Sequence, residues 1–397
     1  MGRARAAPLG RTAAAALGVT WPRAPLLMVS SSSRTGPAEG LISLGRELRA
    51  LGLDARFACD TVRPGENMGE HLARAGVPWE TRLRLSRKVQ PVDVMHDAKL
   101  LTALIRDGRH DLLHAAFAHD HSLALWASRR ARNPDLRVVR AAQRRIDVTP
   151  GIFRRRLWSL RRSDGVLVHS EKYRSELVSA GLDPRRVAHV PAGVDASWFS
   201  PGAAPELRER WGIPRDAPLA GIVARMKPER GHRMLLRAFA QVQRELPQSW
   251  LVLVGRGEDE APLRALAGEL GLSHAVFGGY LRGPGLVEAY RALDVAVWLR
   301  EGNDGGCRGV LEAMACGVPV IAGDDGAPPE LVGETGRVVG AGDIAAISRA
   351  LSELLGDPGR ARTLGGAARE RALRFTPRRA AEETLSFWRR LRDLPRT

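Results

Sequence analysis

The sequence predicts an α/β protein with two doubly wound domains, each built on a parallel sheet. Its 397 residues are too many for one ordinary core and fit two domains of about 150–200 residues. Short apolar segments alternate with amphipathic segments along the chain, which is typical of strands and helices in a parallel sheet. The alternation restarts near residue 219, after a stretch rich in Pro and Gly.

The first half begins with an apolar strand at residues 25–30, followed by a Ser- and Gly-rich loop and an amphipathic helix, LISLGRELRALG. Residues 111–130 are expected to form a strand, a loop and a second helix. Further strands in this half are expected at 55–59, 136–141 and 165–170.

The second half repeats this pattern after the junction VPAGVDASWFSPGAAPELRERWG. Its strands are expected at 219–225, 250–255, 295–299 and 318–323. We therefore expect one domain over residues 24–195 and another over 196–375, with an amphipathic helix at 376–397. Residues 1–23 contain Arg but no acidic residue. We interpret them as a disordered tail or as the product of a start codon placed too early, and a targeting segment stays open.

The composition narrows the function classes. No run of about 18 apolar residues is present, so no transmembrane helix is expected. The three cysteines lack metal-ligand spacing, and their odd number argues against a disulfide framework. A reducing, cytoplasmic location is the simplest interpretation. The formal charge of +17 is suited to binding a negatively charged partner, which can be nucleic acid, an anionic membrane or a phosphorylated ligand. No helix-turn-helix, zinc-finger or basic-aromatic pattern favours nucleic acid.

The segment at 300–323 is the most informative part of the chain. A Gly-rich loop that contains Asp304 leads into a short apolar helix whose single carboxylate is Glu312. Because an unpaired buried carboxylate is costly, we expect Glu312 to have a polar partner. The backbone amides and the dipole at a helix N-terminus can bind an anion, and carboxylates accept hydrogen bonds from hydroxyl groups. The segment therefore indicates a ligand with phosphates and hydroxyls; the alternative is a helix that merely packs on a strand.

Two cations follow the strand at 219–225. Arg225 and Arg230 are five residues apart, and Gly231 permits a tight turn after them. Such a pair can stabilise a diphosphate leaving group; the alternative is ordinary surface charge. Gly255 and Gly257 follow the next strand, but Glu260 stands where a dinucleotide fingerprint has its third glycine. A nicotinamide site is therefore disfavoured. For this loop and for the loop at Gly278 to Leu281, the alternative to ligand binding is two ordinary turns at strand ends.

Five motifs in order give the chain a family resemblance. VPAGVDASWF, GIVARMKPERGH, LVLVGRGE, VFGGY and the block at 300–323 resemble the retaining family 4 glycosyltransferases. The resemblance covers roughly residues 24–397 and is most specific between 190 and 345. It implies a GT-B fold, in which two Rossmann-like domains face a central cleft and the last helix returns to the first domain. Asp304 and Arg230 stand where the family usually has Glu and Lys.

The resemblance also implies roles for individual residues. Glu312 would hold the ribose hydroxyls of a nucleotide sugar, and Asp304 would contact the transferred sugar. His119 would lie beside that sugar, with His121 as an alternative, while Gln143 replaces a histidine of many relatives. Further donor-binding residues would be Gly36, Gly255, Gly257, Gly278, Tyr280, Leu281, Gly305, Gly306, Cys307, Arg308 and Gly309.

The function implied is retaining transfer of a sugar from a nucleotide-diphosphate sugar to a hydroxyl of a glycan or lipid-linked cell-envelope acceptor. Front-face attack would need no protein nucleophile, and we expect no cofactor and no metal. Asp324-Asp325 and Glu258-Asp259-Glu260 are interpreted as solvated loops. The alternatives are a sugar phosphorylase or nucleotide-sugar epimerase on the same fold, and a basic nucleic-acid-binding protein.

Two Arg-rich stretches bear on membrane contact. RLRLSRK at 82–88 and FRRRLWSLRR at 153–162 mix Arg with apolar residues, and Phe153, Leu157 and Leu160 share one helical face. Such segments can lie on anionic lipid, which would place the enzyme peripherally at the inner face of the cytoplasmic membrane. The alternative is that the apolar face joins the core.

Overall fold

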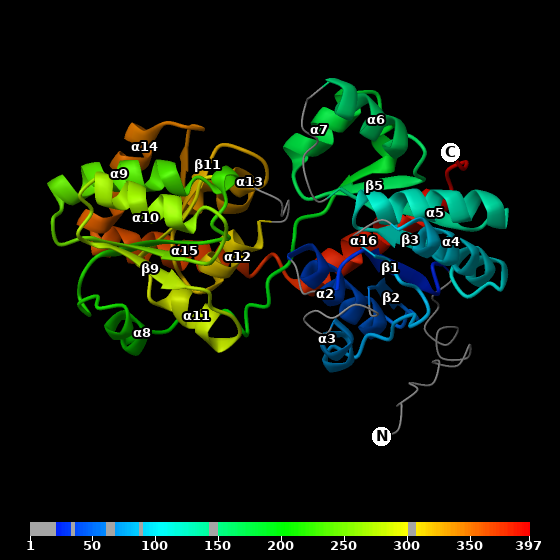
Figure 1. Ribbon diagram of the computed structural model, residues 1–397, viewed down its shortest axis with the longest axis horizontal. Helices are drawn as coiled ribbons and strands as arrows, with labels where there is room; N and C mark the ends of the chain where they lie inside the picture. Colours follow the sequence, from blue (N-terminus) through cyan, green and yellow to red (C-terminus); the bar gives the residue numbers. More distant parts are fainter. Residues whose placement is uncertain (1–20, 33–35, 61–67, 87–89, 143–149, 301–306) are drawn as a thin grey trace. The chain divides into compact units, whose positions relative to one another are not determined.

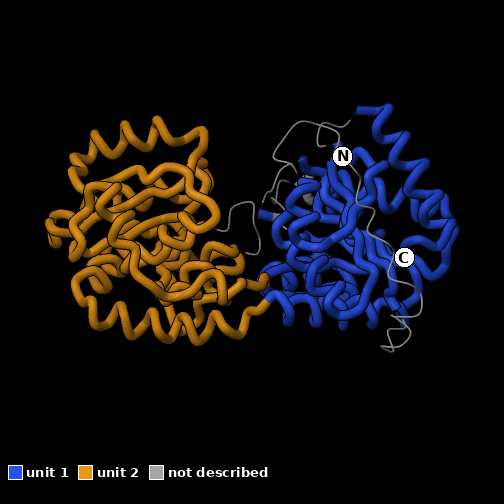
Figure 2. Tube along the Cα trace, turned by 90° about the horizontal axis from the view of Figure 1, so that it is seen from below, with its two compact units in different colours: residues 1–191, 377–397 blue, residues 192–376 orange. Residues whose placement is uncertain are grey.

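The computed structural model describes residues 21–32, 36–60, 68–86, 90–142, 150–300 and 307–397. The chain divides into two compact units, shown in different colours in Figure 2. Unit 1 comprises residues 1–191 and 377–397, and unit 2 comprises residues 192–376. Each unit contains a six-stranded sheet whose paired strands run parallel. The predicted α/β class with two parallel sheets is confirmed.

The sheet of unit 1 has the strand order β2-β1-β3-β4-β5-β6. Its strands are β1 (Pro25–Val29), β2 (Arg56–Cys59), β3 (Leu112–Ala115), β4 (Arg137–Ala141), β5 (Gly165–Val168) and β6 (Val187–His189). Its helices are α2 (Gly36–Ala50), α3 (Met68–Arg74), α4 (Pro91–Arg106), α5 (Ala118–Ala131), α6 (Pro150–Leu160), α7 (Glu171–Ser179) and α16 (Pro377–Arg392), with the 3-10 turn η1 (Pro184–Arg186) (Figure 1).

Alternate residues of β1 face two different cores. Leu27 and Val29 join the core that α2 and α16 cover, whereas Leu26 and Met28 join the core that α4 and α5 cover. Successive side chains of a strand point to opposite faces of the sheet. Because both faces of the sheet are covered, its strands are continuous apolar runs rather than alternating ones.

The C-terminal helix α16 belongs to unit 1. Leu385, Trp388 and Leu391 lie on its buried face, at the spacing of one helical stripe. Gly165 makes the contact with β5 close, because a Cβ there would overlap the Leu391 side chain. The buried Arg137 guanidinium donates to the carbonyl oxygens of Leu391 and Arg392 at 3.1 and 3.0 Å. These bonds satisfy carbonyl groups that a helix end leaves unpaired.

The sheet of unit 2 has the strand order β12-β11-β10-β7-β8-β9. Its strands are β7 (Leu219–Val223), β8 (Trp250–Val254), β9 (Ala275–Gly279), β10 (Val295–Trp298), β11 (Val320–Gly323) and β12 (Arg337–Val339). Its helices are α8 (Pro205–Arg210), α9 (His232–Glu245), α10 (Glu260–Glu269), α11 (Pro284–Arg291), α12 (Arg308–Ala315), α13 (Pro328–Val332), α14 (Ile344–Gly356) and α15 (Pro358–Ala372), with the 3-10 turns η2 (Pro228–Arg230) and η3 (Gly333–Thr335).

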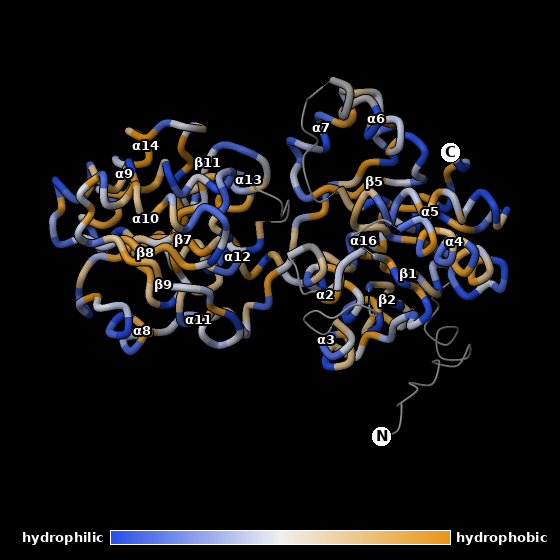
Figure 3. The backbone as a smooth tube through the Cα atoms, in the orientation of Figure 1, coloured by the Kyte–Doolittle hydropathy of each residue, from blue (hydrophilic) through white to orange (hydrophobic). Residues whose placement is uncertain are grey.

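This sheet also separates two cores. One lies under α9, α10 and α14, and the other under α11, α12 and α15. Figure 3 shows the hydrophobic residues concentrated along the strands of the sheet, as a sheet covered on both faces requires.

Two details differ from the sequence analysis. The edge strands β6, β9 and β12 were not expected; β6 and β12 have three residues each, and β9 has five. Helix α2 begins at Gly36, so Gly36 is the first residue of the helix and not part of the preceding loop. Pro37 explains the early start, because its fixed φ suits the first helical turn and its missing N–H is not needed there.

Candidate functional site

The carboxyl ends of β7 and β10 form the centre of the candidate site. These strands are neighbours, but the chain continues from β7 to β8 on one side and from β10 to β11 on the other. Ligands of open α/β sheets bind at such a switch point, outside the carboxyl ends of the strands. The predicted basic pair follows β7, and the segment that leads to Glu312 follows β10. The fold therefore brings the two predicted motifs to adjacent positions.

The two predicted cations differ in their surroundings. Arg225 is exposed in the loop after β7, whereas Arg230 is only 8% exposed. The guanidinium carbon of Arg230 lies 5.6 Å from the centre of the Trp298 ring at the end of β10. Gly231 adopts a φ of 84° before α9, which confirms the expected tight turn. Arg230 is thus held in place by packing, and Arg225 is open to a ligand.

Gly255 and Gly257 bring the loops after β7 and β8 into contact. A Cβ at Gly255 would overlap the carbonyl oxygen of Ala224, and one at Gly257 would overlap that of Met226. The Met226 amide donates to the Arg256 carbonyl at 3.1 Å across the same contact. The glycines therefore serve the packing of the loop that carries Arg225. Their approach to a nucleotide stays a prediction.

A buried polar group beside this loop was not foreseen. His232, the first residue of α9, is buried, and neither ring nitrogen has a hydrogen-bond partner among the described residues. Desolvation lowers its pKa to about 4, so the ring is neutral at pH 7. Asp259 is also buried and forms an ion pair with Arg233. The interpretation of Glu258-Asp259-Glu260 as a solvated loop was therefore wrong for Asp259.

Glu312 has the polar partners that its burial requires. The Tyr290 hydroxyl on α11 donates to Glu312 Oε2 at 2.9 Å. Arg308 Nη2, one turn earlier on α12, donates to Glu312 Oε1 at 3.2 Å. Burial and the nearby carboxylate raise the Tyr290 pKa well above its usual value, so its hydroxyl remains a donor. The sequence predicted a partner for Glu312, and the structure identifies Tyr290 and Arg308.

The start of α12 is packed against β10. Cys307 is buried at the position before the helix, in a left-handed conformation with φ of 44°. A Cβ at Gly309 would overlap the Trp298 ring, so this position requires glycine for close approach. The first amides of a helix have no intrahelical partners and favour anions. Asp304, Gly305 and Gly306 lie outside the described residues.

Three of the predicted donor-binding residues, Gly278, Tyr280 and Leu281, lie at or just after the end of β9. Tyr280 is 46% exposed, and the Arg256 guanidinium carbon lies 4.2 Å from its ring centre. Leu281 packs against the core of unit 2. A Cβ at Gly278 would lie 2.9 Å from the Trp211 ring, so packing on Trp211 is the structural reason for this glycine. Tyr280 is the best placed of the three residues to meet a ligand.

In unit 1, the corresponding switch point lies between β1 and β3. Gly36 begins the helix after β1, and His119 is half-buried in the first turn of the helix after β3. Asp120 is buried, and its carboxylate accepts a hydrogen bond from the Phe117 amide at 3.0 Å and hydrogen bonds from Ser30. Asp120 thereby joins the two loops, while burial raises its pKa.

His121 is a structural residue. It is buried, and its ring nitrogens lie 3.1 Å from Ser159 Oγ and 2.7 Å from Ser163 Oγ. Desolvation lowers its pKa to about 3. Between His119 and His121, only His119 is within reach of solvent.

The Arg-rich stretches place their leucines in the core. Leu83 and Leu85 of the first stretch and Leu157 and Leu160 of the second are buried. The alternative of an apolar face that joins the core is therefore correct for these leucines. Phe153 lies outside the residues whose side chains the structure describes. Trp158, by contrast, is 56% exposed.

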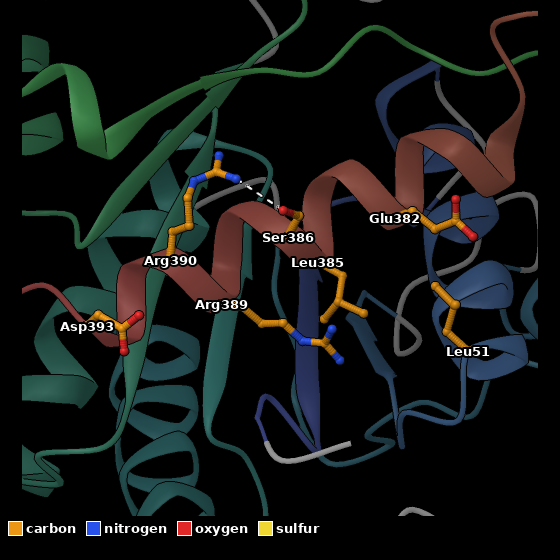
Figure 4. Close-up of a pocket in the computed structure, with 7 residues that line it drawn as sticks. All are labelled: Leu51, Glu382, Leu385, Ser386, Arg389, Arg390 and Asp393. Carbon is orange, nitrogen blue, oxygen red and sulfur yellow. Dashed lines mark hydrogen bonds between the residues drawn. The ribbon is translucent and has the colours of Figure 1, made fainter. Parts of the chain in front are cut away.

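Two further features of the described residues complete the survey. None of their helices is long and apolar enough to span a membrane, and they contain no cluster of three metal-ligating His, Cys, Asp or Glu side chains. A surface pocket in unit 1 lies along α16, where Arg390 donates to Ser386 Oγ at 3.1 Å (Figure 4). It shares no residue with the predicted site.

Several known proteins resemble the chain. It is 38% identical over 222 residues to the GDP-mannose-dependent alpha-(1-6)-phosphatidylinositol monomannoside mannosyltransferase of Mycolicibacterium smegmatis. The aligned region covers 53% of this chain and 58% of that protein. It is 29% identical over 333 residues to the phosphatidyl-myo-inositol mannosyltransferase of Mycobacterium leprae, covering 81% and 83% of the two chains. The match to the Mycolicibacterium smegmatis protein takes in only 58% of that protein, and the match to a GDP-mannose-dependent mannosyltransferase of Corynebacterium glutamicum takes in only 50% of its length.

Solved structures share the fold. Anabaena HepE in complex with UDP-glucose superposes with a TM-score of 0.77 at 21% identity, over 91% of this chain and 99% of that one. Two family models match consecutive parts of the sequence. "Glycosyltransferase Family 4" matches residues 35–198 and "Glycosyl transferases group 1" matches residues 203–371. Together they take in most of the chain in the order expected, and the protein therefore belongs to the family 4 glycosyltransferases of the GT-B fold.

Proposed function

We propose that the protein transfers a glycosyl unit from a nucleotide-diphosphate sugar to an acceptor hydroxyl, with retention of the anomeric configuration. The observation that carries this proposal is that Arg225 and Arg230 follow β7, while Glu312 lies on α12, the helix that follows the neighbouring strand β10. Cations suit a diphosphate, and a carboxylate suits hydroxyl donors. Family membership supports the reaction class.

In the proposed reaction, the bond between the anomeric carbon and the diphosphate oxygen breaks. A bond from the acceptor oxygen to the same carbon forms on the same face of the sugar, and the acceptor proton passes to the departing diphosphate. Arg225, Arg230 and the first amides of α12 stabilise the charge that develops on the diphosphate. The role of Asp304 toward the transferred sugar stays the one that the family resemblance implies. No protein nucleophile is needed.

The donor that we propose to test first is GDP-mannose. The similar mannosyltransferases of Mycolicibacterium smegmatis and Corynebacterium glutamicum are described as GDP-mannose-dependent. In the proposed complex, Glu312 accepts from the ribose hydroxyls, and the exposed Tyr280 ring lies near the base. UDP-glucose is the second donor to test, because HepE was solved with it.

We propose a lipid-linked or glycan acceptor of the cell envelope, reached from the cytoplasmic side of the membrane. The support in the structure is the layer of α4, α5 and α6 on one face of unit 1. Arg106 of α4 donates to the Arg130 carbonyl of α5, and His121 of α5 contacts Ser159 of α6, so the three helices are adjacent (Figure 1).

The outer surface of this layer is both aromatic and cationic. Trp126 and Trp158 are 43% and 56% exposed, and guanidinium groups of Arg130 and Arg162 lie over their rings. Neither α5 nor α6 exposes an acidic side chain in the parts described, since Asp120 is buried. Aromatic residues that insert at the headgroup level and basic residues that attract anionic lipid are the features of a membrane-surface contact.

A ligand panel followed by product analysis tests the proposal. Thermal unfolding with GDP-mannose, UDP-glucose and other nucleotide sugars should identify a donor by a raised melting temperature. Incubation with that donor and a membrane extract should give a product whose anomeric proton, followed by NMR, keeps the donor's configuration. Turnover only with inorganic phosphate, epimerisation without acceptor, or tight nucleic-acid binding without any donor effect would overturn it.

An arginine outside the site gives the matched control. Arg225→Ala should abolish most of the transfer activity. Arg215→Ala should leave it unchanged, because Arg215 is also exposed but precedes β7, at the opposite end of that strand. Equal losses in the two variants would show that a general loss of positive charge, and not the site, lowers the activity.

A further inference from the structure

The buried contact between α11 and α12 carries an inference about how the donor is recognised. Tyr290 of α11 is buried, and its hydroxyl donates to Glu312 Oε2 at 2.9 Å. The ring also packs edge-on against Phe199, with 6.0 Å between the ring centres. Tyr290 is therefore fixed at both ends, by packing of its ring and by a charge-assisted hydrogen bond from its hydroxyl.

The two oxygens of Glu312 have partners of different exposure. Oε2 meets the fully buried Tyr290, whereas Oε1 meets Arg308, whose side chain is 23% exposed. Oε2 thus faces the core and Oε1 faces the more open side of the site. An ionised carboxylate offers about four acceptor positions, so these two bonds alone do not use up its capacity to accept. The orientation of the carboxylate decides whether those positions point toward a ligand.

We infer that Tyr290 is a positioning residue that orients Glu312 for a vicinal diol, the ribose of the donor nucleotide. This inference rests on the proposed function, because it takes the hydroxyl partner of Glu312 to be ribose. Tyr290 holds Oε2 toward the core, against the attraction of Oε1 to the Arg308 guanidinium on the other side. Without that bond the carboxylate can turn to meet the guanidinium with both oxygens, a geometry that arginine favours.

The Tyr290 hydroxyl suits this task at any pH of cellular life. Burial is the main reason that its pKa is raised well above the usual value, and the adjacent carboxylate adds to the effect. The hydroxyl therefore stays protonated and always donates. A phenolate in the same place would have no proton to donate and would repel the Glu312 carboxylate.

Binding of nucleotides that lack ribose hydroxyls tests the inference. Dissociation constants for GDP, 2′-deoxy-GDP and 2′,3′-dideoxy-GDP, and for the uridine series, are measured by calorimetry with the wild-type chain, Tyr290→Phe and Phe199→Leu. Wild type should prefer the ribose form. Tyr290→Phe should bind the ribose nucleotide roughly tenfold more weakly than wild type does. It should bind the dideoxy nucleotide with the wild-type affinity. The ratio of the two dissociation constants should therefore be roughly tenfold smaller in Tyr290→Phe than in wild type.

Phe199→Leu is the matched control, because it removes the packing partner of the Tyr290 ring but keeps the hydroxyl. We expect it to lower the melting temperature and leave the preference for ribose intact. The double variant Tyr290→Phe/Glu312→Gln should bind no more weakly than Glu312→Gln alone, since the two residues act as one unit.

The outcomes separate the inference from the proposed function. If wild type prefers ribose and Tyr290→Phe keeps that preference, the inference about Tyr290 is wrong and the donor site stands. If wild type binds the nucleotides without any preference for ribose, the role of Glu312 fails and the inference with it. If neither nucleotide series binds, the proposed donor class itself is wrong.

Discussion

Glu312→Gln is the substitution that tests the donor site most directly. Gln has nearly the same shape as Glu and keeps one acceptor oxygen, so Tyr290 can still donate to it. The other carboxylate oxygen becomes an NH2 group that faces the Arg308 guanidinium, where the structure has a 3.2 Å ion pair. The substitution therefore removes the negative charge and one acceptor at a site that is nearly buried.

The effect on binding can be worked out from hydrogen-bond energies. A hydrogen bond to an ionised group contributes about 1.5–3 kcal/mol, and one between neutral groups about 0.5–1.5 kcal/mol. The loss for a ribose hydroxyl is the difference, about 1–2 kcal/mol, so the dissociation constant of the donor should rise roughly 5- to 30-fold. The lost ion pair is partly exposed and should cost stability about 1 kcal/mol or less.

Calorimetric titration with the donor, together with thermal unfolding of the ligand-free variant, measures both effects. We expect weaker binding of the donor, seen as a higher dissociation constant, and a melting temperature lowered by no more than about 2–4 °C. Arg308→Ala provides a comparison, because it removes the ion pair and keeps the carboxylate. An unchanged affinity in correctly folded Glu312→Gln protein would refute the assignment of Glu312 to the donor.

Four further predictions follow from the same structure. Arg225→Ala should lower kcat with little change in melting temperature, whereas Arg230→Ala should lower both, because Arg230 is packed beside Trp298; equal rates to wild type in both variants would place the diphosphate elsewhere. Transfer should continue in EDTA, since two cations can serve the diphosphate; activity that is lost in EDTA and restored by magnesium or manganese would contradict this. The protein should co-sediment with anionic but not neutral liposomes, less so in high salt or as Trp158→Ala; failure to pellet at low salt would remove the membrane from the proposal. The pKa of His121 is lowered to about 3 by burial, so as pH falls below about 6.5 the unfolded chain binds a proton that the folded chain does not, and stability declines. Thermal unfolding between pH 7 and 4 should show a shallower decline in stability for His121→Gln than for the wild-type chain, and an equal decline in the two would contradict this prediction.

Much of the fold could be predicted from the sequence because its central strands are uninterrupted apolar runs. The strands at the centre of each sheet were placed within a few residues of their observed bounds, for example 219–225 for Leu219–Val223. The edge strand β9 was missed although it has five residues, because it ends in two glycines, which are depleted in strands. The edge strands β6 and β12 were missed as well. With three residues each, they are too short to show a periodicity, and their pairing depends on the neighbouring strand rather than on their own composition.

The site could be predicted only in part. Local motifs indicated Arg225, Arg230 and Glu312, because each stands at a fixed distance from a recognisable strand or glycine. Tyr290 could not be found in this way, since its bond to Glu312 spans 22 residues and depends on how two helices pack. His232 was missed for the same reason. The sequence does not reveal whether a histidine at the start of an amphipathic helix is buried.

Trp298 shows why the glycine motifs and the charged residues occur together. Its ring, at the end of β10, is approached so closely by Gly309 that a Cβ there would overlap it, and the Arg230 guanidinium lies 5.6 Å from the same ring. One apolar side chain therefore contacts both the first turn of α12 and the loop after β7. Because packed interiors adjust poorly to added volume, a larger residue at Gly309 must displace the ring or the helix, and with it the position of Arg230 or Glu312. The glycine is required by the aromatic ring, and the ring in turn fixes the distance between the groups that we propose to hold the diphosphate and the ribose.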